Sequence, residues 1–440
     1  MLSTIKHILT SESIRRKILF TIAILVLYRL FVVIPVPFVD IEVLKQAVSN
    51  TTQGIQFFAM LMGGTLQKFS VVALWLIPFI NASIILQLLT VVIPQLEELK
   101  EEGETGNMKI QQYTRRLTLP LAFLQAIWMV YLIATYIPGV INTHSFGIVL
   151  GAAFALTVWT ILLIRLGEMI TEKGIANGIS LLIFASIVAG MTSSFMNFMN
   201  PANGSNLMSI FVFIMVIVLV LIVLSILLIR TRKEIPIVYA KAGKIQETAV
   251  LPIPLNPVGM IPIIFAIAFV SFPYLLGNIV YKLNPASPGA QAFKDFVETY
   301  LNIYTNNPHW VVVLLYFVLI VMFTFFYSWV VFKPEKMAEQ IQKRGGYIPG
   351  IRPGEETARY LNDILMHLCF WWGIGLGIIG VYTYVINWIP FIQDMVRTGG
   401  LNAVPVIVSG AGIIIIVGVV QEVINKINAD LLMEKYSKIV

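Results

Sequence analysis

Charged residues and cysteines are both scarce in this chain of 440 residues. Only 12% of the residues are charged, whereas 58% are hydrophobic. Soluble domains are about 25% charged, so the composition excludes an ordinary soluble protein and predicts an integral membrane protein. The one cysteine, Cys369, has no partner for an intramolecular disulfide and is expected to pack within a membrane span.

The chain also lacks the motifs that carry catalysis. It contains no HExxH, no Walker lysine motif, no CxxC, no GxSxG and no cluster of carboxylates at mid-membrane depth. Its 4 histidines are scattered over different segments, so we predict neither a metal site nor a cofactor. A coupled carrier normally needs intramembrane carboxylates or unwound carbonyl sites. These absences argue against an enzyme and against a coupled carrier. A secondary transporter of small solutes is kept as an alternative class, in which an intramembrane charge such as Arg29 would bind the substrate.

Long apolar runs recur along the whole chain. Because about 20 apolar residues cross a hydrocarbon core, these runs predict ten transmembrane helices. The expected spans cover residues 18–36, 70–93, 117–137, 146–166, 178–199, 207–229, 257–280, 309–332, 364–390 and 402–424.

The distribution of positive charge orients these spans. With the N-terminus inside, 23 of the 30 Lys and Arg residues lie in inner segments and only 5 in outer ones. Inner loops of membrane proteins are rich in Lys and Arg, so both termini are expected in the cytoplasm. Ten spans form two halves of five, residues 1–205 and 206–440. Because five is odd, the second half must be inverted relative to the first, an arrangement that commonly encloses a central path.

Residues 51–94 contain a short apolar segment followed by a long one. Residues 55–62 are too few to cross a membrane, the Gly63-Gly64 break follows, and residues 69–93 are long enough. Backbone that stops partway into a bilayer is tolerated only where protein or a water-filled cavity surrounds it. This pattern therefore predicts an all-α fold with a short re-entrant helix beside an interior cavity.

The long run carries a mixed helix face. Leu76, Ile80, Ser83 and Gln87 recur at the spacing of one helix face, apolar toward one end and polar toward the other. Such a face is typical of a pore-lining helix. A helix contact held by small and polar side chains would give the same spacing, so both interpretations remain open.

Two further predictions concern charge near the spans. Arg29 is placed near the middle of the first span, where it would face protein or water, as a functional group or in a structural pair. The loop at residues 97–116 is rich in charge and contains two glycines, so it is expected to be solvated and mobile.

Two inner loops stand apart from the others. Residues 230–256 have β-branched stretches on either side of Ala-Gly-Lys, which predicts a protruding hairpin. Residues 333–361 begin as a charged helix, continue as GGYIPGIRPG and then restart a helix. The glycines and prolines around Arg352 predict a stiff tip of the kind that presents a docking residue. A solvated loop that only follows the positive-inside rule would have the same composition.

The chain resembles the SecY family of protein-conducting channels. The resemblance is dispersed over the whole length, and its motifs are specific when taken together. They are IPVP at 34–37, IPFINASIILQLL at 77–89, YTRR at 113–116, LGEMITEKGIANGISLLIF at 166–184, MIPIIFA at 260–266 and GYIPGIRPGEETARYL at 346–361.

The resemblance implies a central channel subunit that conducts unfolded secretory proteins and releases transmembrane segments sideways into the bilayer. A plug, at about residues 55–66, would fill the outer funnel. Its residues are Phe57, Phe58, Met60, Leu61, Met62, Gly63 and Gly64. A ring of apolar side chains would form the constriction as a dewetting gasket. Its residues are Leu76, Ile80, Ile179, Ile183, Ile264 and Ile415.

The resemblance also implies a lateral gate and several partners. Ser83, Gln87 and Gln125 would line the gate, which opens between the second and seventh spans. The partners would be the SecE and SecG subunits, the SecA motor ATPase, the ribosome, membrane lipid, and secretory and membrane polypeptides that carry signal sequences. No direct specificity for nucleic acid is implied. The protein would lie in a bacterial cell membrane. The residues that would receive the motor or the ribosome are Lys343, Arg344, Tyr347, Arg352, Arg232 and Lys233.

The sequence departs from the family pattern at several positions. Trp75, Phe31, Phe38 and Ala176 stand where the family usually has glycine, and Arg165 stands where it usually has tryptophan. The hairpin loop is short and has few basic residues. These changes bear on packing near Trp75 and on docking at the hairpin.

Overall fold

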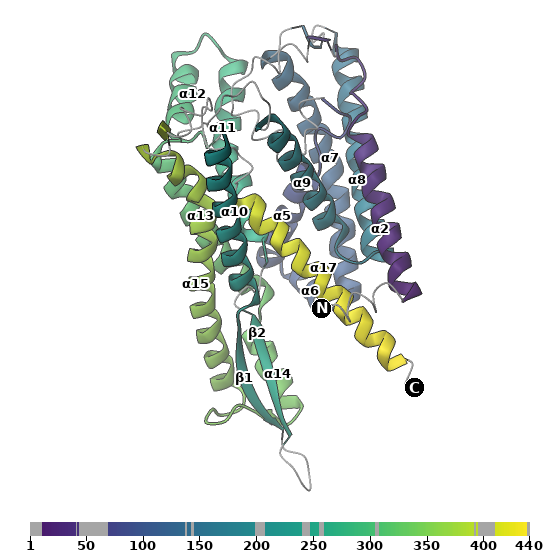
Figure 1. Cartoon of the computed structure of the whole chain (residues 1–440), viewed down its shortest axis with the longest axis vertical. Helices are drawn as coiled ribbons and strands as arrows, with labels where there is room; N and C mark the ends of the chain where they lie inside the picture. Colours follow the sequence, from purple (N-terminus) through teal and green to yellow (C-terminus); the bar gives the residue numbers. More distant parts are fainter. Residues whose placement is uncertain are drawn as a thin grey trace. The chain divides into compact units, whose positions relative to one another are not determined.

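A computed structural model describes most of the chain as two compact helical units (Figure 1). Unit 1 comprises residues 1–200, 405–407 and 419–440, and unit 2 comprises 201–404 and 408–418. The predicted plug lies outside the described residues. Those residues are 11–40, 42–43, 69–136, 139–141, 145–198, 207–239, 247–254, 259–303, 308–390, 393–394 and 410–437.

Unit 1 is built from helices that follow one another along the chain. Helix α8 packs against α7 and α9, α7 packs against α5, and α2 packs against α8 and α9. The bounds are α2 Glu12–Phe31, α5 Ile77–Val92, α6 Pro94–Glu101, α7 Glu104–Tyr136, α8 Phe146–Lys173 and α9 Gly178–Phe198.

Helix α2 is shifted along the sequence from its predicted bounds. Ser11 caps its start by accepting a hydrogen bond from the Ile14 N–H at 3.4 Å, as N-cap serines do. Arg29 therefore lies in the last turn of α2, while its place near the middle of a membrane span stays a prediction. A cation suits a helix C-terminus because the backbone carbonyls there carry partial negative charge.

Residues 69–76 are not helical, so the predicted helix over 70–93 is wrong in its first third. Helix α5 begins only at Ile77. The preceding backbone instead bonds to the segment after α2: the Val36 N–H donates to the Phe69 carbonyl and the Val71 N–H to the Ile34 carbonyl, both at 2.9 Å. These long-range hydrogen bonds replace the helical ones that an apolar run alone would favour.

The charged loop predicted at residues 97–116 is mostly helical. Helix α6 occupies its start, and α7 already begins at Glu104. Only Ile93 separates α5 from Pro94, the first residue of α6, and the two helices meet at a bend of 105°. A proline fits the first turn of a helix, so it starts α6 in a new direction.

The turn between α8 and α9 depends on close backbone contact. A Cβ added at Gly178 would lie 1.9 Å from the carbonyl oxygen of Gly167. The Asn177 side chain caps α9 and accepts hydrogen bonds from the Ile179 and Ser180 N–H groups, at 3.0 and 3.3 Å.

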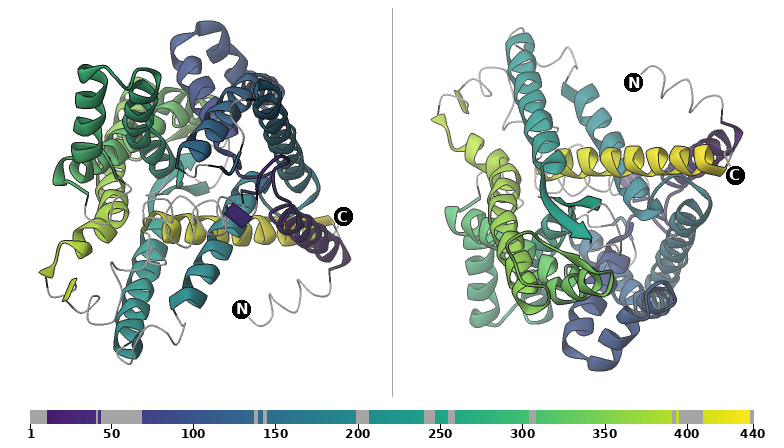
Figure 2. Two further views of the ribbon diagram at one scale, coloured as in Figure 1. Left: turned by 90° about the horizontal axis from the view of Figure 1, so that it is seen from above. Right: turned by 90° about the horizontal axis from the view of Figure 1, so that it is seen from below.

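The C-terminal part of α17 (Gly410–Ser437) belongs to unit 1 and is tied to the start of α2. Lys17 Nζ lies 2.6 Å from Asp430 Oδ2, and Ser11 Oγ donates to Glu434 Oε2 at 2.5 Å. In both views of Figure 2, the C-terminal end of α17 lies next to α2. These two carboxylates of α17 thus connect it to the N-terminal end of α2.

Unit 2 combines helices with a small antiparallel sheet. Helix α13 packs against α11 and α15, α12 packs against α11, and α14 packs against α15. The strand order is β2-β1-β3. The bounds are α10 Leu207–Arg230, β1 Arg232–Tyr239, β2 Glu247–Pro254, α11 Ile261–Leu283, α12 Pro288–Tyr300, α13 Trp310–Val331, α14 Pro334–Lys343, β3 Gly346–Tyr347 and α15 Glu355–Asn387.

Several described helices are apolar and long enough to cross a membrane. Four qualify singly, and the bent pair of α5 and α6 qualifies when taken together. Shorter apolar helices lie at 178–192, 215–230 and 261–270. The structure therefore confirms a multi-span helical membrane protein, while the count of ten spans and the inverted relation of the halves stay predictions.

Candidate docking surface and channel elements

The two loops that the sequence singled out form one sheet. Strands β1 and β2 pair along their full length, from Arg232 opposite Pro254 to Tyr239 opposite Glu247, which confirms the predicted hairpin. Strand β3 comes from the second loop and pairs with the end of β1, where Val238 faces Tyr347. We name the sheet, α14 and residues 344–364 the docking module.

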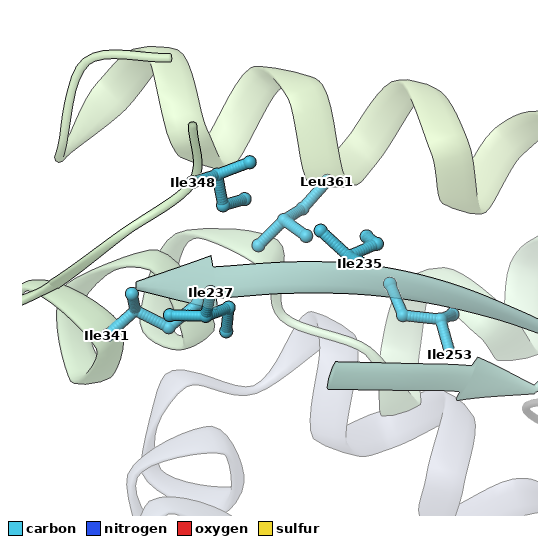
Figure 3. Packing of buried hydrophobic residues seen from close by; sticks show 6 residues of the cluster. All are labelled: Ile235, Ile237, Ile253, Ile341, Ile348 and Leu361. Carbon is cyan, nitrogen blue, oxygen red and sulfur yellow. The ribbon is translucent and has the colours of Figure 1, made fainter. Parts of the chain in front are cut away.

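An apolar core holds the docking module together (Figure 3). Its members come from both loops and from α15, and all are buried. Burying such a side chain contributes roughly 1.5–3 kcal/mol, so the core fixes the strands against the helices. Its residues are Ile235, Ile237, Ile253, Ile341, Ile348 and Leu361.

The backbone around Arg352 has a defined shape. Gly350 and Gly354 have φ values of 83° and 102°, which favour glycine because it has no Cβ. The hydroxyl of Thr357, which is buried, donates to the Arg352 carbonyl at 2.8 Å. The Arg352 side chain is exposed, so a constrained backbone presents a mobile cation to solvent, as the glycine and proline pattern predicted.

The other predicted docking residues are distributed over the same module. Arg232 and Lys233 lie at the start of β1, Lys343 and Arg344 follow one another at the end of α14, and all four are exposed. Tyr347 lies in β3 and is half-buried. The sheet therefore joins the predicted docking residues of both loops in one folded module.

Lys343 already has an ionic partner on its own helix. Its Nζ lies 2.7 Å from Glu339 Oε1, one turn away. The hydrogen bond from Lys343 holds the pKa of the Glu339 carboxyl below its ordinary value. Both side chains are well exposed, so this pair contributes little to stability.

Four predicted ring residues belong to unit 1. Leu76 is the N-cap of α5 and fully buried, and its carbonyl accepts from the Ile80 N–H at 2.9 Å, so the two share a helix face. Ile179 and Ile183 lie one turn apart at the start of α9. Ile179 packs toward Gly167 of α8, and Ile183 is 6% exposed. Their role in a constriction stays a prediction.

Two predicted ring residues belong to unit 2. Ile264 is half-buried in the first turns of α11, and Ile415 is buried near the start of α17. Nearby, a Cβ on Gly410 would lie 1.6 Å from the Ile379 carbonyl oxygen. This close approach fixes the start of α17 against α15.

The predicted gate residues lie on two adjacent helices of unit 1. Gln87 Nε2 donates to Ser83 Oγ at 3.1 Å, which confirms that they share one face of α5. The Gln87 Oε1 atom is buried and has no hydrogen-bond partner among the described residues. Gln125 is half-buried on α7, which packs against α5. A buried, unpaired amide oxygen is costly, and the role of these three residues in a gate stays a prediction.

The departures from the family pattern have visible structural consequences. Trp75 and Phe38 have φ values of 50° and 69°, a region where glycine is favoured. Phe31, by contrast, stacks edge-on against Trp159 with ring centroids 4.8 Å apart. The glycines expected at positions 38 and 75 thus match left-handed backbone, which this chain adopts with aromatic residues instead.

Arg165 belongs to a small cluster of ion pairs. Glu168 accepts from Arg165 at 3.2 Å and also pairs with Arg115 of α7. The substitution of the family's tryptophan therefore adds a charge that has an acidic partner. Among the described residues, no group of three potential metal ligands exists, and we assign no metal site there.

A bundle of apolar helices with a folded, charged loop module is the architecture of a multi-span channel or carrier. Comparison with known proteins decides between these classes. The sequence model of the SecY family matches residues 70–424. The chain belongs to the SecY family.

Related chains match along nearly their full length. The protein translocase subunit SecY of Corynebacterium glutamicum is 33% identical over 451 residues, covering 99% of both chains. The protein of the same name from Mycobacterium leprae is 35% identical over 453 residues, again with 99% of both chains covered.

Solved structures share the fold. A structure described as "The structure of a protein conducting channel" matches with a TM-score of 0.62 at 18% identity and covers 97% of this chain and 94% of its own. Sec61 in the canine ribosome-channel complex from the endoplasmic reticulum matches with a TM-score of 0.59, also at 18% identity, with the same coverage.

Proposed function

We propose that this chain is the channel-forming subunit of a protein translocase. It conducts unfolded secretory proteins across the membrane and releases apolar segments sideways into lipid. The observation that carries this proposal is the identity of about a third to translocase subunits across 99% of both chains. The alignments cover nearly all of this chain and of those relatives, so this chain is long enough to form the same channel.

In this proposal, a partner protein supplies the energy for transport. The sequence holds no nucleotide-binding motif, so the chain acts as a conduit and a docking platform rather than as an enzyme. The exposed cations of the docking module form the receiving surface for SecA or the ribosome, in the cytoplasm. The SecE and SecG subunits and the bilayer surround the remaining apolar faces in a bacterial cell membrane.

The experiment for the docking role is charge reversal at Arg352. Because Arg352 is exposed, Arg352→Glu is expected to leave membrane insertion intact and to abolish SecA-dependent export of a secretory precursor into vesicles. Arg16→Glu is the matched control, because Arg16 is an exposed arginine outside the docking module that pairs with Glu12 at 2.7 Å on α2. Normal export by the Arg352→Glu protein refutes the assignment of this residue.

The experiment for the channel itself is site-specific crosslinking. A photoreactive residue at Ile80 or Ile183 is expected to crosslink to a stalled secretory polypeptide, with adducts that depend on the arrested chain. Crosslinks only to lipid or to neighbouring helices, while the chain is demonstrably engaged, overturn the ring assignment and reopen the transporter class.

The resting channel is sealed by the plug in this proposal, and Ser83, Gln87 and Gln125 line its lateral exit. Deleting residues 55–66 is expected to raise ion conductance across planar bilayers, because a seal has been removed. An unchanged conductance counts against a plug in this segment.

A further inference from the structure

Helix α12 is an amphipathic helix at the end of unit 2 opposite the β1–β2 hairpin (Figure 1). It connects α11 to α13, so it lies where the chain leaves and re-enters the membrane. Its 13 residues present three distinct faces. The predicted spans end at residue 280 and resume at 309, and the role of this helix is not part of the function proposed above.

The first face packs against α11. Ala290 and Val297, two turns apart, are the buried residues of α12. A Cβ placed on Gly277 of α11 would lie 3.2 Å from the Cβ of Val297, so the helices approach closely at this point. This contact fixes the rotation of α12 about its own axis and thereby decides where its other faces point.

The second face is aromatic and exposed. Phe293, Phe296 and Tyr300 follow one another at three- and four-residue spacing and are 40%, 52% and 40% exposed. The Tyr300 ring contacts His309 at 4.9 Å, and His309 in turn lies 5.7 Å from Trp310, which is 60% exposed. The aromatic surface is therefore continuous from α12 to the first residue of α13.

That surface continues into an apolar stripe on α13. Trp310, Leu314, Val318 and Met322 recur every four residues, and each is about half exposed or more. In a membrane span such a stripe lies against lipid or another apolar helix. The aromatic face of α12 lies at its end, at the depth where tryptophan and tyrosine concentrate in membrane proteins.

The third face is polar. Gln291, Asp295 and Glu298 share it, and all three are exposed. Lys294 lies toward the packed side, with its ammonium 4.5 Å from the centre of the Tyr281 ring of α11 and 3.9 Å from Glu298. A polar face beside an aromatic one is the pattern of a helix that lies in the plane of a membrane surface.

We propose that α12 is an interfacial helix that inserts Phe293, Phe296 and Tyr300 into the headgroup region of the leaflet opposite the docking module. The occupant of this surface is lipid, because the aromatic face continues the apolar stripe of a membrane span and has no charge of its own. The helix thereby anchors the connection between α11 and α13 at a fixed depth.

The test measures depth with a fluorophore in the full-length protein. Phe296→Cys and Phe293→Cys are made on a Cys369→Ala background, labelled with an environment-sensitive dye and reconstituted in phosphatidylcholine and phosphatidylglycerol vesicles. Asp295→Cys, on the polar face of the same helix, is the matched control. Quenching by brominated lipid reports contact with the bilayer, and quenching by aqueous iodide reports exposure to water.

The expected result is a blue-shifted emission at positions 293 and 296, with stronger quenching by brominated lipid than at 295 and weaker quenching by iodide. Equal iodide quenching at 295 and 296 overturns the proposal, because the aromatic face would then be in water. Protection of 296 from both quenchers also overturns it, because protein would then cover the face. Two aromatic positions keep the result decisive if one variant does not fold.

Discussion

The two ends of unit 2 are built for different surroundings. At one end, the docking module encloses its own core of isoleucine and leucine and exposes arginine and lysine. At the other end, α12 buries only Ala290 and Val297 and exposes phenylalanine and tyrosine. A charged surface needs an internal core to hold its shape in water, whereas an aromatic surface can be held by the bilayer. Under the two proposals made above, one helical unit presents a partner surface at one end and a lipid surface at the other.

The largest effect on this comparison is expected from removing the core of the docking module. Leu361→Ala should lower the free energy of unfolding by about 2–5 kcal/mol, because Leu361 of α15 is fully buried in the cluster that packs against the sheet. Hydrogen exchange of the β1 amides should then accelerate, while α12 is unchanged. Met366→Ala, at an exposed position on the same helix, is the control. Unchanged protection of β1 would show that Leu361 is not needed to hold the sheet.

A smaller loss of stability is expected from a substitution at the contact between α12 and α11. Gly277→Leu places a side chain where even a Cβ lies within 3.2 Å of Val297, and overpacking of this kind costs about 1–3 kcal/mol. The amides of α12 should exchange faster, and those of the docking module should not. Gly289→Ala is the control, because its nearest neighbour is Ser287 Oγ at 3.8 Å. If both variants behave alike, the close contact does not hold α12.

A finer test separates the shape of the docking tip from its charge. Thr357→Val keeps the volume of the side chain but removes the hydrogen bond to the Arg352 carbonyl, worth about 0.5–1.5 kcal/mol. Affinity for SecA should fall although every cation remains. Thr357→Ser, which retains the hydroxyl, should restore binding. Weak binding by the serine variant as well would mean that the threonine methyl matters more than the bond.

The smallest effect is expected at Glu339. Because its pKa is lowered in the folded protein, the pair with Lys343 favours folding above the ordinary carboxyl pKa, and this contribution is lost as pH falls through the lowered value. Glu339 is fully exposed, so Glu339→Gln should not measurably change thermal stability. It should slightly increase the affinity for an acidic partner by releasing Lys343. A clear drop in melting temperature at neutral pH would contradict the exposed-pair interpretation.

Much of the docking module could be predicted from the sequence. The β-branched stretches around Ala-Gly-Lys predicted the hairpin, and the restart of a helix after Pro353 was correct at Glu355. The union of the two loops was not predicted, because strand β3 has only two residues and carries no periodic signal. The role of Thr357 was missed for a similar reason: its partner, Arg352, is identified only when the loop has folded.

The errors in unit 1 share one physical cause. The apolar run at residues 69–76 was interpreted as helix from its composition, but its backbone pairs with the segment after α2. The charged run at 97–116 was interpreted as a loop from its composition, but it is mostly helical. Apolar content indicates burial and charge indicates exposure, and neither decides by itself where the backbone hydrogen bonds go. Helix α12 could have been found, because Phe293, Phe296 and Tyr300 have helical spacing.

The bonds between α17 and α2 carry a consequence for biosynthesis. Lys17 and Asp430 are 413 positions apart, and Ser11 and Glu434 are 423 apart. At a synthesis rate of about 5–20 residues per second, roughly 20–80 s pass between the appearance of Lys17 and that of its partner. Unit 1 supplies the first residues to be made, yet it is the last to be completed. For that interval the start of α2 must be kept without its native contacts, and a ribosome stalled before Asp430 would hold the chain in that state.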